Sequence, residues 1–308
     1  MARRRRGQPV NGWVVLDKPE GMTSTQAVSA VRRAFDAQKA GHAGTLDPVA
    51  TGVLPIALGE ATKTVPFAVD GDKTYRFTLR WGEATDTEDR EGRVTAVSEV
   101  RPGRDAIAAV LPRFLGEITQ VPPRYSAIKI DGQRAYDLAR AEEVVEMAPR
   151  QVRIDRLELV ALPDADHAVF EVDCGKGTYM RSLGRDIALA LGSLGHLVAL
   201  RRLAVGPFTE EMAIPLDFLD HDTHGAAVYS HLLPLETALD DIPALALSEP
   251  EAARLRNGQP VSLMRSGDLA RLAGIEAGDL VLATAHGSPV AIGRIERGAL
   301  APVRVLNL

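Results

Sequence analysis

With 308 residues, the chain is longer than one hydrophobic core usually supports, and its length predicts two domains. Its composition, 45% hydrophobic and 25% charged, is typical of a soluble globular protein. The sequence contains no run of about 18 apolar residues, the length that a membrane-spanning helix needs. The single cysteine, Cys174, excludes an internal disulfide, and the four arginines at residues 3–6 precede polar residues, unlike a signal peptide. These features predict a cytoplasmic protein.

The net charge of −5 at first disfavours a nucleic-acid partner. The charge is unevenly distributed, however, because residues 203–253 hold ten acidic residues and no lysine or arginine. Without those ten of the 41 acidic residues, 31 face 36 basic residues, a net charge of +5 on the rest of the chain. A polyanion responds to such local charge, so RNA stays a candidate partner; an acidic face that only maintains solubility is the alternative reading.

The N-terminal segment predicts a strand followed by a helix. Residues 11–16 are apolar and β-branched, and they end just before Lys18. Thr23 and Gln26 have the spacing of a capping box, and apolar residues recur at helical spacing from 27 to 35.

Residues 41–55 contain three glycines and two prolines, which predict a shaped loop instead of a helix or strand. One carboxylate, Asp47, lies near its centre, and Pro48 biases it towards an extended or turn conformation. A lone carboxylate on a stiff loop suits either a structural turn or a catalytic nucleophile. Spacing alone favours the turn, because Asp-Pro is ordinary turn chemistry.

The loop sequence carries a resemblance that changes this interpretation. Gly-His-x-Gly-x-Leu-Asp-Pro-x-Ala-x-Gly-x-Leu-Pro, continued by Gly-Glu-Ala-Thr-Lys at 59–63, resembles the signature of the bacterial tRNA pseudouridine-55 synthases of the TruB type. The resemblance implies that Asp47 is the nucleophile and that His42 fills the space that a flipped base vacates. It also implies RNA or substrate contacts for Gly44 and Thr45. Lys18 belongs to a second motif of this family, which packs beneath the loop, and we include it among the contacts.

Residues 73–81 alternate between polar and apolar side chains, which predicts a half-buried strand with Tyr75 on its apolar face. The pattern alone favours a core role for Tyr75, whereas the family's Lys-Thr-Tyr motif implies a tyrosine that stacks on the target base. The acidic segment 86–92 lacks the ligand positions of an EF-hand loop. We interpret it as a solvated loop, with an RNA-facing Asp-Thr pair implied by the resemblance as the alternative.

Apolar residues between 107 and 115 predict an amphipathic helix, and a distinctive segment follows at about 122–150. It resembles the family's mobile insertion, a flap that closes over RNA. Prolines precede cations that alternate with aromatic residues, a composition that suits phosphate contact and base stacking. We therefore predict RNA contacts for Arg124, Tyr125 and Lys129; an ordinary surface helix and hairpin is the alternative.

The segment after Cys174 is expected to supply a cation. Glycines turn the chain there, and Thr178 can cap a helix whose first turn includes Arg181. An arginine at such a position is, by itself, more often a surface residue. The motif Gly-Thr-Tyr-x-Arg-Ser-Leu resembles the family block whose arginine pairs with the catalytic aspartate, which implies an Asp47–Arg181 ion pair and a substrate contact for Tyr179.

The segment 200–208 resembles the end of the family's catalytic domain, and it implies RNA contacts for Leu200 and Arg202. From about residue 244, short β-prone segments alternate with glycines, and residues 280–292 are expected to form a hairpin. This part resembles the PUA RNA-binding module. We predict a pseudouridine synthase catalytic domain at 1–243, with the RNA-clamping insertion at about 122–150, and a PUA-like domain at 244–308. The fold class is α/β (α+β): a mixed, mainly antiparallel sheet with helices packed around it, plus a small C-terminal β-barrel.

The predicted reaction breaks the N1–C1′ bond of a uridine and rejoins the ring through C5, so it requires no redox cofactor, ATP or metal. The sequence has neither a dinucleotide-binding glycine motif nor a phosphate-binding loop, and its histidines and cysteine lack zinc spacing, so we expect no cofactor and no metal. Asp47 would attack ring C6 or sugar C1′, and a nearby guanidinium would favour its charged form. Extruding the base costs roughly a few kcal/mol, and stacking on Tyr75 recovers about 1–3 kcal/mol. The hydroxyl of Tyr75 can also assist removal of the C5 proton.

Three functions therefore remain open. The first is a stand-alone isomerase of uridine 55 in the T stem-loop of tRNA, a monomer with no obligatory protein partner and no membrane association. The second is the related RNA-guided synthase that depends on partner proteins, which the insertion and the lack of long lysine-rich tails disfavour. The third is a non-catalytic RNA-binding or RNA-folding module, which the joint presence of Asp47, Tyr75 and Arg181 disfavours.

Overall fold

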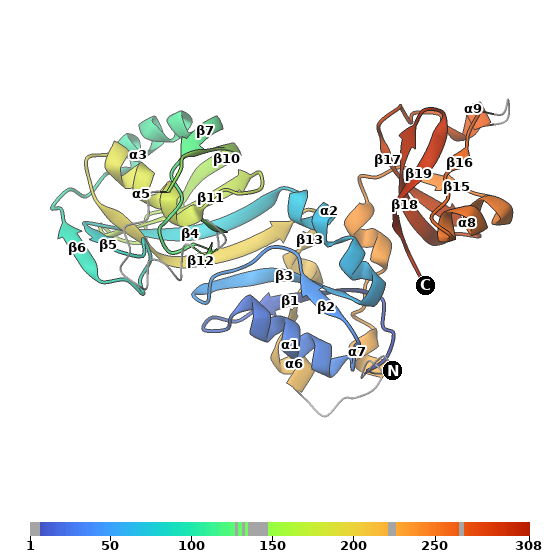
Figure 1. Ribbon diagram of the computed structural model, residues 1–308. Coiled ribbons are helices and arrows are strands. Elements are labelled where there is room, and N and C mark those ends of the chain that lie inside the picture. Colours follow the sequence, from blue (N-terminus) through green and yellow to red (C-terminus); the bar gives the residue numbers. More distant parts are fainter. Residues whose placement is uncertain (1–6, 127–128, 131–132, 135–146, 221–225, 265–267) are drawn as a thin grey trace.

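Two β-sheets organise the chain, one of ten strands and one of five (Figure 1). The computed structural model describes residues 7–126, 129–130, 133–134, 147–220, 226–264 and 268–308. Among these residues, none of the helices combines the length and the apolar character that crossing a membrane requires.

The large sheet has the strand order β14-β1-β3-β12-β4-β11-β10-β7, with β13 beside β12 and β2 beside β3. Most neighbours are antiparallel, but β12 runs parallel to β3, and β14 runs parallel to β1. The mixed, mainly antiparallel sheet that we predicted is therefore confirmed. Its strands are β1 (Gly12–Lys18), β2 (Ala40–His42), β3 (Ala50–Leu58), β4 (Lys73–Trp81), β7 (Gly116–Gln120), β10 (Arg150–Ala161), β11 (His167–Cys174), β12 (Gly195–Val205), β13 (Phe208–Thr209) and β14 (Ile214–Pro215).

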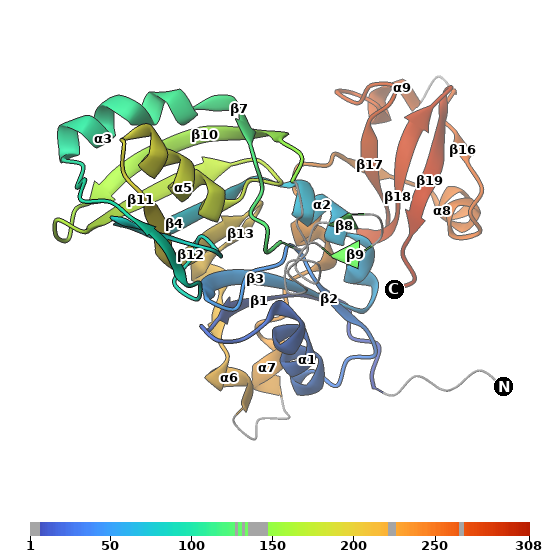
Figure 2. The same cartoon turned by 60° about the vertical axis from the view of Figure 1, so that its left-hand side comes forward.

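Helices cover this sheet in two groups. Helices α3 (Arg104–Val110) and α5 (Met180–Ala190) share one apolar core with β4, β10 and β11, and Figure 2 shows them on the same side of the sheet. Helix α1 (Ser24–Ala34) packs on β1 and β3 at the other half, with α6 (Asp217–Asp220) and α7 (Ala226–Tyr229) beside it. A short helix, α2 (Val65–Asp70), precedes β4, and the small hairpins are β5 (Glu83–Thr85) with β6 (Val94–Val97) and β8 (Lys129–Ile130) with β9 (Gln133–Arg134).

The start of α1 follows the predicted capping box. The hydroxyl of Thr23 accepts a hydrogen bond from the Gln26 amide nitrogen at 3.2 Å, and the Gln26 side chain accepts one from the Thr23 amide nitrogen at 2.9 Å. Both bonds satisfy backbone donors that a helix N-terminus leaves free. This fixes where the chain turns from β1 into α1.

Strand β12 lies between β3 and β4 and sets the register on both sides. Arg202 is paired with Gly52 of β3 and with Tyr75 of β4, while Leu200 is paired with Ala50 and Phe77. Gly52 has φ +98°, and a Cβ there would meet the Arg202 carbonyl oxygen at 2.2 Å, so this close approach requires glycine. The loop that precedes β3 is thus brought to the middle of β12.

The C-terminal sheet has the order β15-β17-β18-β19-β16 and curls into a half-barrel, so the small β-barrel that we expected is only half closed. The predicted hairpin is present, and its turn is His286-Gly287, both with positive φ. Lys63 Nζ donates to the Val305 carbonyl at 2.7 Å and links the half-barrel to the rest of the chain. The elements are β15 (Ala244–Ala246), α8 (Glu249–Arg256), β16 (Val261–Ser262), α9 (Asp268–Arg271), β17 (Leu280–Ala285), β18 (Ser288–Glu296) and β19 (Ala299–Val305).

Phe170 of β11 offers a test of the core beneath α3 and α5. Its ring is fully buried, stacks on Phe77 with centroids 5.2 Å apart and meets Trp81 edge-on at 6.4 Å. We expect Phe170→Ala to lower the free energy of unfolding by about 3–5 kcal/mol, because it leaves a cavity that the sheet cannot fill. Urea denaturation measures this loss. Val97→Ala, at a side chain 73% exposed, is the control and should change the value by less than about 0.5 kcal/mol.

Candidate active site

The side chains of Asp47 and Arg181 meet although 134 positions separate them in the chain. Arg181 lies in the first turn of α5, as expected, and its Nη2 is 2.9 Å from Asp47 Oδ2. The arginine side chain is 7% exposed, whereas the aspartate side chain is 39% exposed. The structure thus pairs an inward-facing cation with a carboxylate that can still be reached from outside.

Arg181 has three further oxygen partners. Its Nη1 donates to the Thr87 carbonyl at 3.1 Å and lies 3.6 Å from Asp89 Oδ2, and its Nη2 donates to the Tyr125 carbonyl at 2.8 Å. These partners come from segments far apart in the sequence. A guanidinium held from several sides cannot swing away from Asp47 without leaving a buried charge unpaired.

The prediction that the acidic segment 86–92 is a solvated loop holds only in part, because Asp86, Arg90 and Glu91 are exposed but the centre of the segment faces inward. Asp89 is buried beside Arg181, and Glu88 forms an ion pair with Arg185 at 2.5 Å. Burial raises the pKa of Glu88, and Arg185 opposes that effect. The centre of the segment therefore packs against the guanidinium of Arg181, a location that the local composition does not indicate.

The loop that carries Asp47 is tied down through its backbone. The hydroxyl of Ser24 accepts a hydrogen bond from the Leu46 amide at 2.9 Å and donates to the Leu46 carbonyl at 3.0 Å. The Pro48 carbonyl accepts from the Gly21 amide at 2.8 Å. Ser24 ends the motif, beginning at Lys18, that the resemblance places beneath this loop, but the sequence did not single it out as the residue that holds Leu46.

Lys18 is fully buried beneath this loop. Its Nζ donates to the carbonyls of Pro19 at 2.9 Å, Met22 at 2.6 Å and Pro48 at 3.3 Å. Burial lowers the pKa of Lys18 to about 8, although the charge of Asp47 acts in the opposite direction. A side chain without exposed surface does not suit the RNA contact that we predicted; these bonds favour a role in positioning the loop.

A cavity of about 230 Å³ opens beside the Asp47–Arg181 pair. Its volume lies below the usual range for drug-sized ligands, which favours a small flat group such as a nucleobase. It brings together eight of the side chains or backbone positions that we predicted from sequence: Gly44, Thr45, Asp47, Tyr75, Tyr179, Arg181, Leu200 and Arg202.

The ring of Tyr75 is half-buried at the wall of this cavity. Burial raises the pKa of its hydroxyl, and the charge of Arg202 offsets part of this rise. The phenol is therefore protonated at neutral pH. Stacking on a base needs only the ring, whereas removal of a proton would first require the phenolate.

Arg202 and Lys73 add buried positive charge to the cavity wall. Arg202 donates to the Val53 carbonyl at 2.7 Å and to the Gly44 carbonyl at 3.1 Å, and Lys73 donates to the carbonyls of Val69 and Gly71. Burial, with the charge of Arg202, lowers the pKa of Lys73. Lys73 was not among the predicted site residues, although the Lys-Thr-Tyr motif contains it.

His42 lies at the end of β2, outside the residues that line the cavity. Burial and the charge of Arg202 lower the pKa of His42, so the imidazole is neutral at pH 7. Its Nδ1 is buried and has no hydrogen-bond partner among the described residues. The structure therefore does not bring His42 to the Asp47–Arg181 pair.

The predicted clamp is described only in part. Arg124 is exposed, the carbonyl of Tyr125 contacts Arg181, and Lys129 lies in the short strand β8. The Lys129 side chain and much of the insertion, at residues 127–128, 131–132 and 135–146, lie outside the described residues. RNA contact by these residues remains a prediction.

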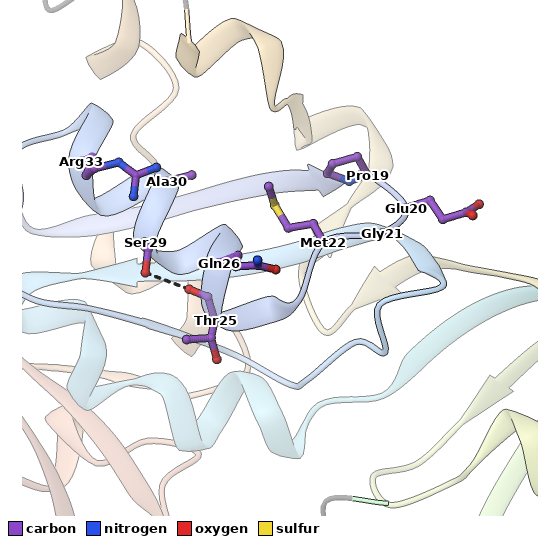
Figure 3. Close-up of a pocket in the computed structure, with 9 residues that line it drawn as sticks. All are labelled: Pro19, Glu20, Gly21, Met22, Thr25, Gln26, Ser29, Ala30 and Arg33. Carbon is purple, nitrogen blue, oxygen red and sulfur yellow. Dashed lines mark hydrogen bonds between the residues drawn. The ribbon is translucent and has the colours of Figure 1, made fainter. Parts of the chain in front are cut away.

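A larger cavity of about 560 Å³ lies along the exposed side of α1 (Figure 3). Polar side chains of Thr25, Gln26 and Ser29 face it, and Ser29 is bonded to the Thr25 carbonyl. Its acidic residue, Glu20, is already paired with Arg90. The described residues also contain no cluster of three or more histidine, cysteine or acidic side chains arranged to hold a metal ion. The smaller cavity, which holds the nucleophile candidate and its cation, is the candidate active site.

Comparisons with known proteins identify the family to which the chain is similar. A family model described as TruB family pseudouridylate synthase (N terminal domain) matches residues 32–180. Models described as tRNA pseudouridylate synthase B C-terminal domain and Pseudouridine synthase II TruB, C-terminal, match residues 181–240 and 243–306.

Similar proteins and structures cover almost the entire chain. A protein of Bradyrhizobium diazoefficiens named tRNA pseudouridine synthase B is 59% identical over 99% of this chain and 88% of its own length, and one of Rhodospirillum rubrum with the same name is 54% identical over 100% of both. A chain in a solved H/ACA RNP bound to a substrate RNA containing 2′-deoxyuridine aligns with a TM-score of 0.73 and 25% identity, over 100% of this chain and 92% of that one. A chain of a Cbf5-Nop10-Gar1 complex aligns with a TM-score of 0.71 and 28% identity, over 96% and 84%.

The lowered pKa of Lys18 predicts a pH-dependent contribution to stability. Because its pKa is about 8 in the folded state and 10.5 in the unfolded state, the unfolded state binds more protons between these values. The folded state should therefore gain stability relative to the Lys18→Met variant as pH rises through this window, by up to about 1.4 kcal/mol per pH unit. Urea denaturation of both proteins at about pH 7 and about pH 9.5 measures the difference. Equal differences at both pH values would contradict the assignment.

Proposed function

Because this chain belongs to the TruB family of tRNA pseudouridine synthases and is an isomerase of that kind, we propose that it converts uridine 55 in the T loop of tRNA into pseudouridine. The observation that carries the proposal is the ion pair between Asp47 and Arg181 at the wall of a small cavity. Within the described residues, this cavity joins a reachable carboxylate, a buried guanidinium and an aromatic ring.

The target uridine enters this cavity by leaving its stack in the RNA loop. Extrusion costs roughly a few kcal/mol, and stacking of the base on Tyr75 offsets about 1–3 kcal/mol of this cost. Tyr179, from the segment that precedes α5, and Leu200, from β12, line the same cavity and close around the base. His42, at the end of β2, occupies the position that the base leaves in the RNA loop.

Asp47 then attacks the nucleotide, either at ring C6 or at sugar C1′. Arg181 stabilises the negative charge of the carboxylate before attack, and its bonds to Thr87 and Tyr125 keep it in place. A carboxylate that is oriented in advance acts without reorganising its surroundings, which is the usual source of electrostatic catalysis.

The atoms of the reaction balance without another reactant. The N1–C1′ bond breaks, the C5–C1′ bond forms, C5 loses a proton and N1 gains one. The ring must turn so that C5 occupies the place of N1, and a half-turn about the line through N3 and C6 does this. Asp47 is the group at the cavity that can take the C5 proton directly, whereas the hydroxyl of Tyr75 would first have to ionise, which its raised pKa opposes. We expect no cofactor to take part.

The remaining parts of the chain serve RNA binding in this proposal. Arg124, which is exposed, and Lys129 of strand β8 contact phosphates of the T stem-loop. The C-terminal half-barrel is a PUA-like RNA-binding domain that follows a catalytic domain of about 243 residues. The protein acts as a monomer without an obligatory protein partner.

Asp47→Asn tests the role of the carboxylate, because it keeps the size of the side chain and removes its charge and nucleophilicity. We expect wild-type protein to produce pseudouridine at position 55 of an unmodified tRNA and the variant to produce none, with RNA affinity retained. Mapping of pseudouridine by position and a filter-binding assay measure the two effects.

The matched control for this variant is Asp70→Asn, at an exposed carboxylate paired with Lys176. It should retain turnover, because Asp70 lies outside the residues that line the cavity. Turnover by Asp47→Asn within about tenfold of wild type would remove Asp47 from the mechanism. Modification at another position alone would disprove the proposed substrate site.

Arg181→Lys tests the planar cation. A lysine keeps the charge, but one ammonium nitrogen replaces the planar pair of nitrogens that reaches Asp47, Thr87 and Tyr125, so the turnover number should fall by more than the RNA affinity does. Single-turnover rates and dissociation constants measure this difference. A loss confined to affinity would instead identify Arg181 as a phosphate contact.

A further inference from the structure

Ser126 holds a buried hydroxyl group that has no hydrogen-bond partner among the described residues. The residue is 4% exposed and lines the same cavity as Asp47, Tyr75 and Arg181. A buried hydroxyl without a partner costs free energy, and native structures contain few of them. A missing partner at the wall of a binding cavity indicates that the ligand supplies it.

Three other buried polar atoms also lack partners in the described part of the chain, and none of them lines this cavity. They are Nε1 of Trp13, Nε1 of Trp81 and Nδ1 of His42. The two tryptophans lie in the apolar cores on the sheet, away from the ion pair. Of these four buried atoms, the Ser126 hydroxyl oxygen alone belongs to a residue that lines the cavity.

Several other polar groups of the cavity wall are already engaged. Thr178 donates to the Gly175 carbonyl at 3.0 Å, Lys176 pairs with Asp70 at 2.9 Å, and Lys73 is bonded to two carbonyls. The position of Ser126 is also fixed from its neighbour, because the Tyr125 carbonyl accepts a hydrogen bond from Arg181. Ser126 is a donor held in place and left free for a ligand.

We propose that Ser126 is a specificity residue whose hydroxyl donates a hydrogen bond to a ring carbonyl of the bound uracil. The inference rests on the proposed function, since that function places the target base in this cavity. It assigns to the segment at 124–126 a direct contact with the base, in addition to the phosphate contacts proposed for the insertion.

Because uracil has two ring carbonyls placed symmetrically, one fixed donor can bond the ring in both the substrate and the product orientation. The half-turn about the line through N3 and C6 exchanges N1 with C5, and it also exchanges O2 with O4. A fixed donor that faces one carbonyl before the turn therefore faces the other carbonyl afterwards. Ser126 stabilises the substrate orientation and the product orientation of the ring without moving.

Ser126→Ala separates this role from a structural one. The substitution removes a hydroxyl that has no partner in the free protein, so the melting temperature should stay unchanged or rise. It also removes one hydrogen bond to the base, so kcat/KM on unmodified tRNA should fall about tenfold. A stability loss with unchanged kcat/KM would overturn the proposal.

Ser193→Ala is the matched control. Ser193 is equally buried, but its hydroxyl donates to the Val100 carbonyl at 2.9 Å, and it does not line the cavity. This variant should lose melting temperature and retain kcat/KM, the reverse of Ser126→Ala.

Thio-substituted tRNA identifies the contact itself. Sulfur is a weaker acceptor than oxygen, so wild-type protein should lose rate on tRNA with 2-thiouridine or 4-thiouridine at position 55, and Ser126→Ala should lose less. If Ser126→Ala lowered the rate on both thio-substituted tRNAs by the same factor as on unmodified tRNA, the proposed contact would be overturned. Failure of the proposed function gives a different result from failure of the Ser126 contact. In that case wild-type protein would leave uridine 55 unmodified, or Asp47→Asn would remain active.

Discussion

The charge of Arg181 is the constraint around which the site is arranged. A guanidinium with 7% of its side chain exposed needs oxygen partners on every side, and it finds them in Asp47, Asp89 and the carbonyls of Thr87 and Tyr125. The partners belong to the loop of Asp47, to the acidic segment after β5 and to the start of the insertion. One buried cation thus fixes three segments of the chain relative to α5.

Buried groups also hold the loop of Asp47 from beneath. Lys18 and Arg202 are fully buried cations whose bonds go to backbone carbonyls, and Ser24 bonds both the amide and the carbonyl of Leu46. Because these contacts use the backbone, they restrict the path of the loop whatever its side chains are. The position of the Asp47 carboxylate follows from this path, so the carboxylate is oriented in advance, as the nucleophilic role proposed for it requires.

The hydroxyl of Ser126 differs from these groups in a way that matters for substrate recognition. The cations satisfy their hydrogen bonds within the protein and therefore stabilise the free enzyme. Among the residues that the structure describes, Ser126 has no partner, and in the contact proposed above it gains one from the bound base. Binding energy that is available only in the complex can distinguish one base from another, whereas contacts that exist beforehand mainly give the site its shape.

The sequence determined the features that depend on neighbouring residues. The capping box of Thr23 and Gln26 places the start of α1, the alternation at 73–81 gives β4, and the glycines and prolines at 41–55 give the loop of Asp47. The family motif added the pairing of Asp47 with Arg181. Local patterns carry this information because periodicity and turn stereochemistry act over a few residues.

Only the tertiary structure decided the burial of Lys18, the inward position of Asp89, the support from Ser24 and the free hydroxyl of Ser126. Each depends on the sheet order, in which β12 separates β3 from β4 and α5 packs behind them. The local sequence around a charged or polar residue does not show whether its side chain faces water or a buried partner. Its surroundings are set by contacts between segments that no local pattern links.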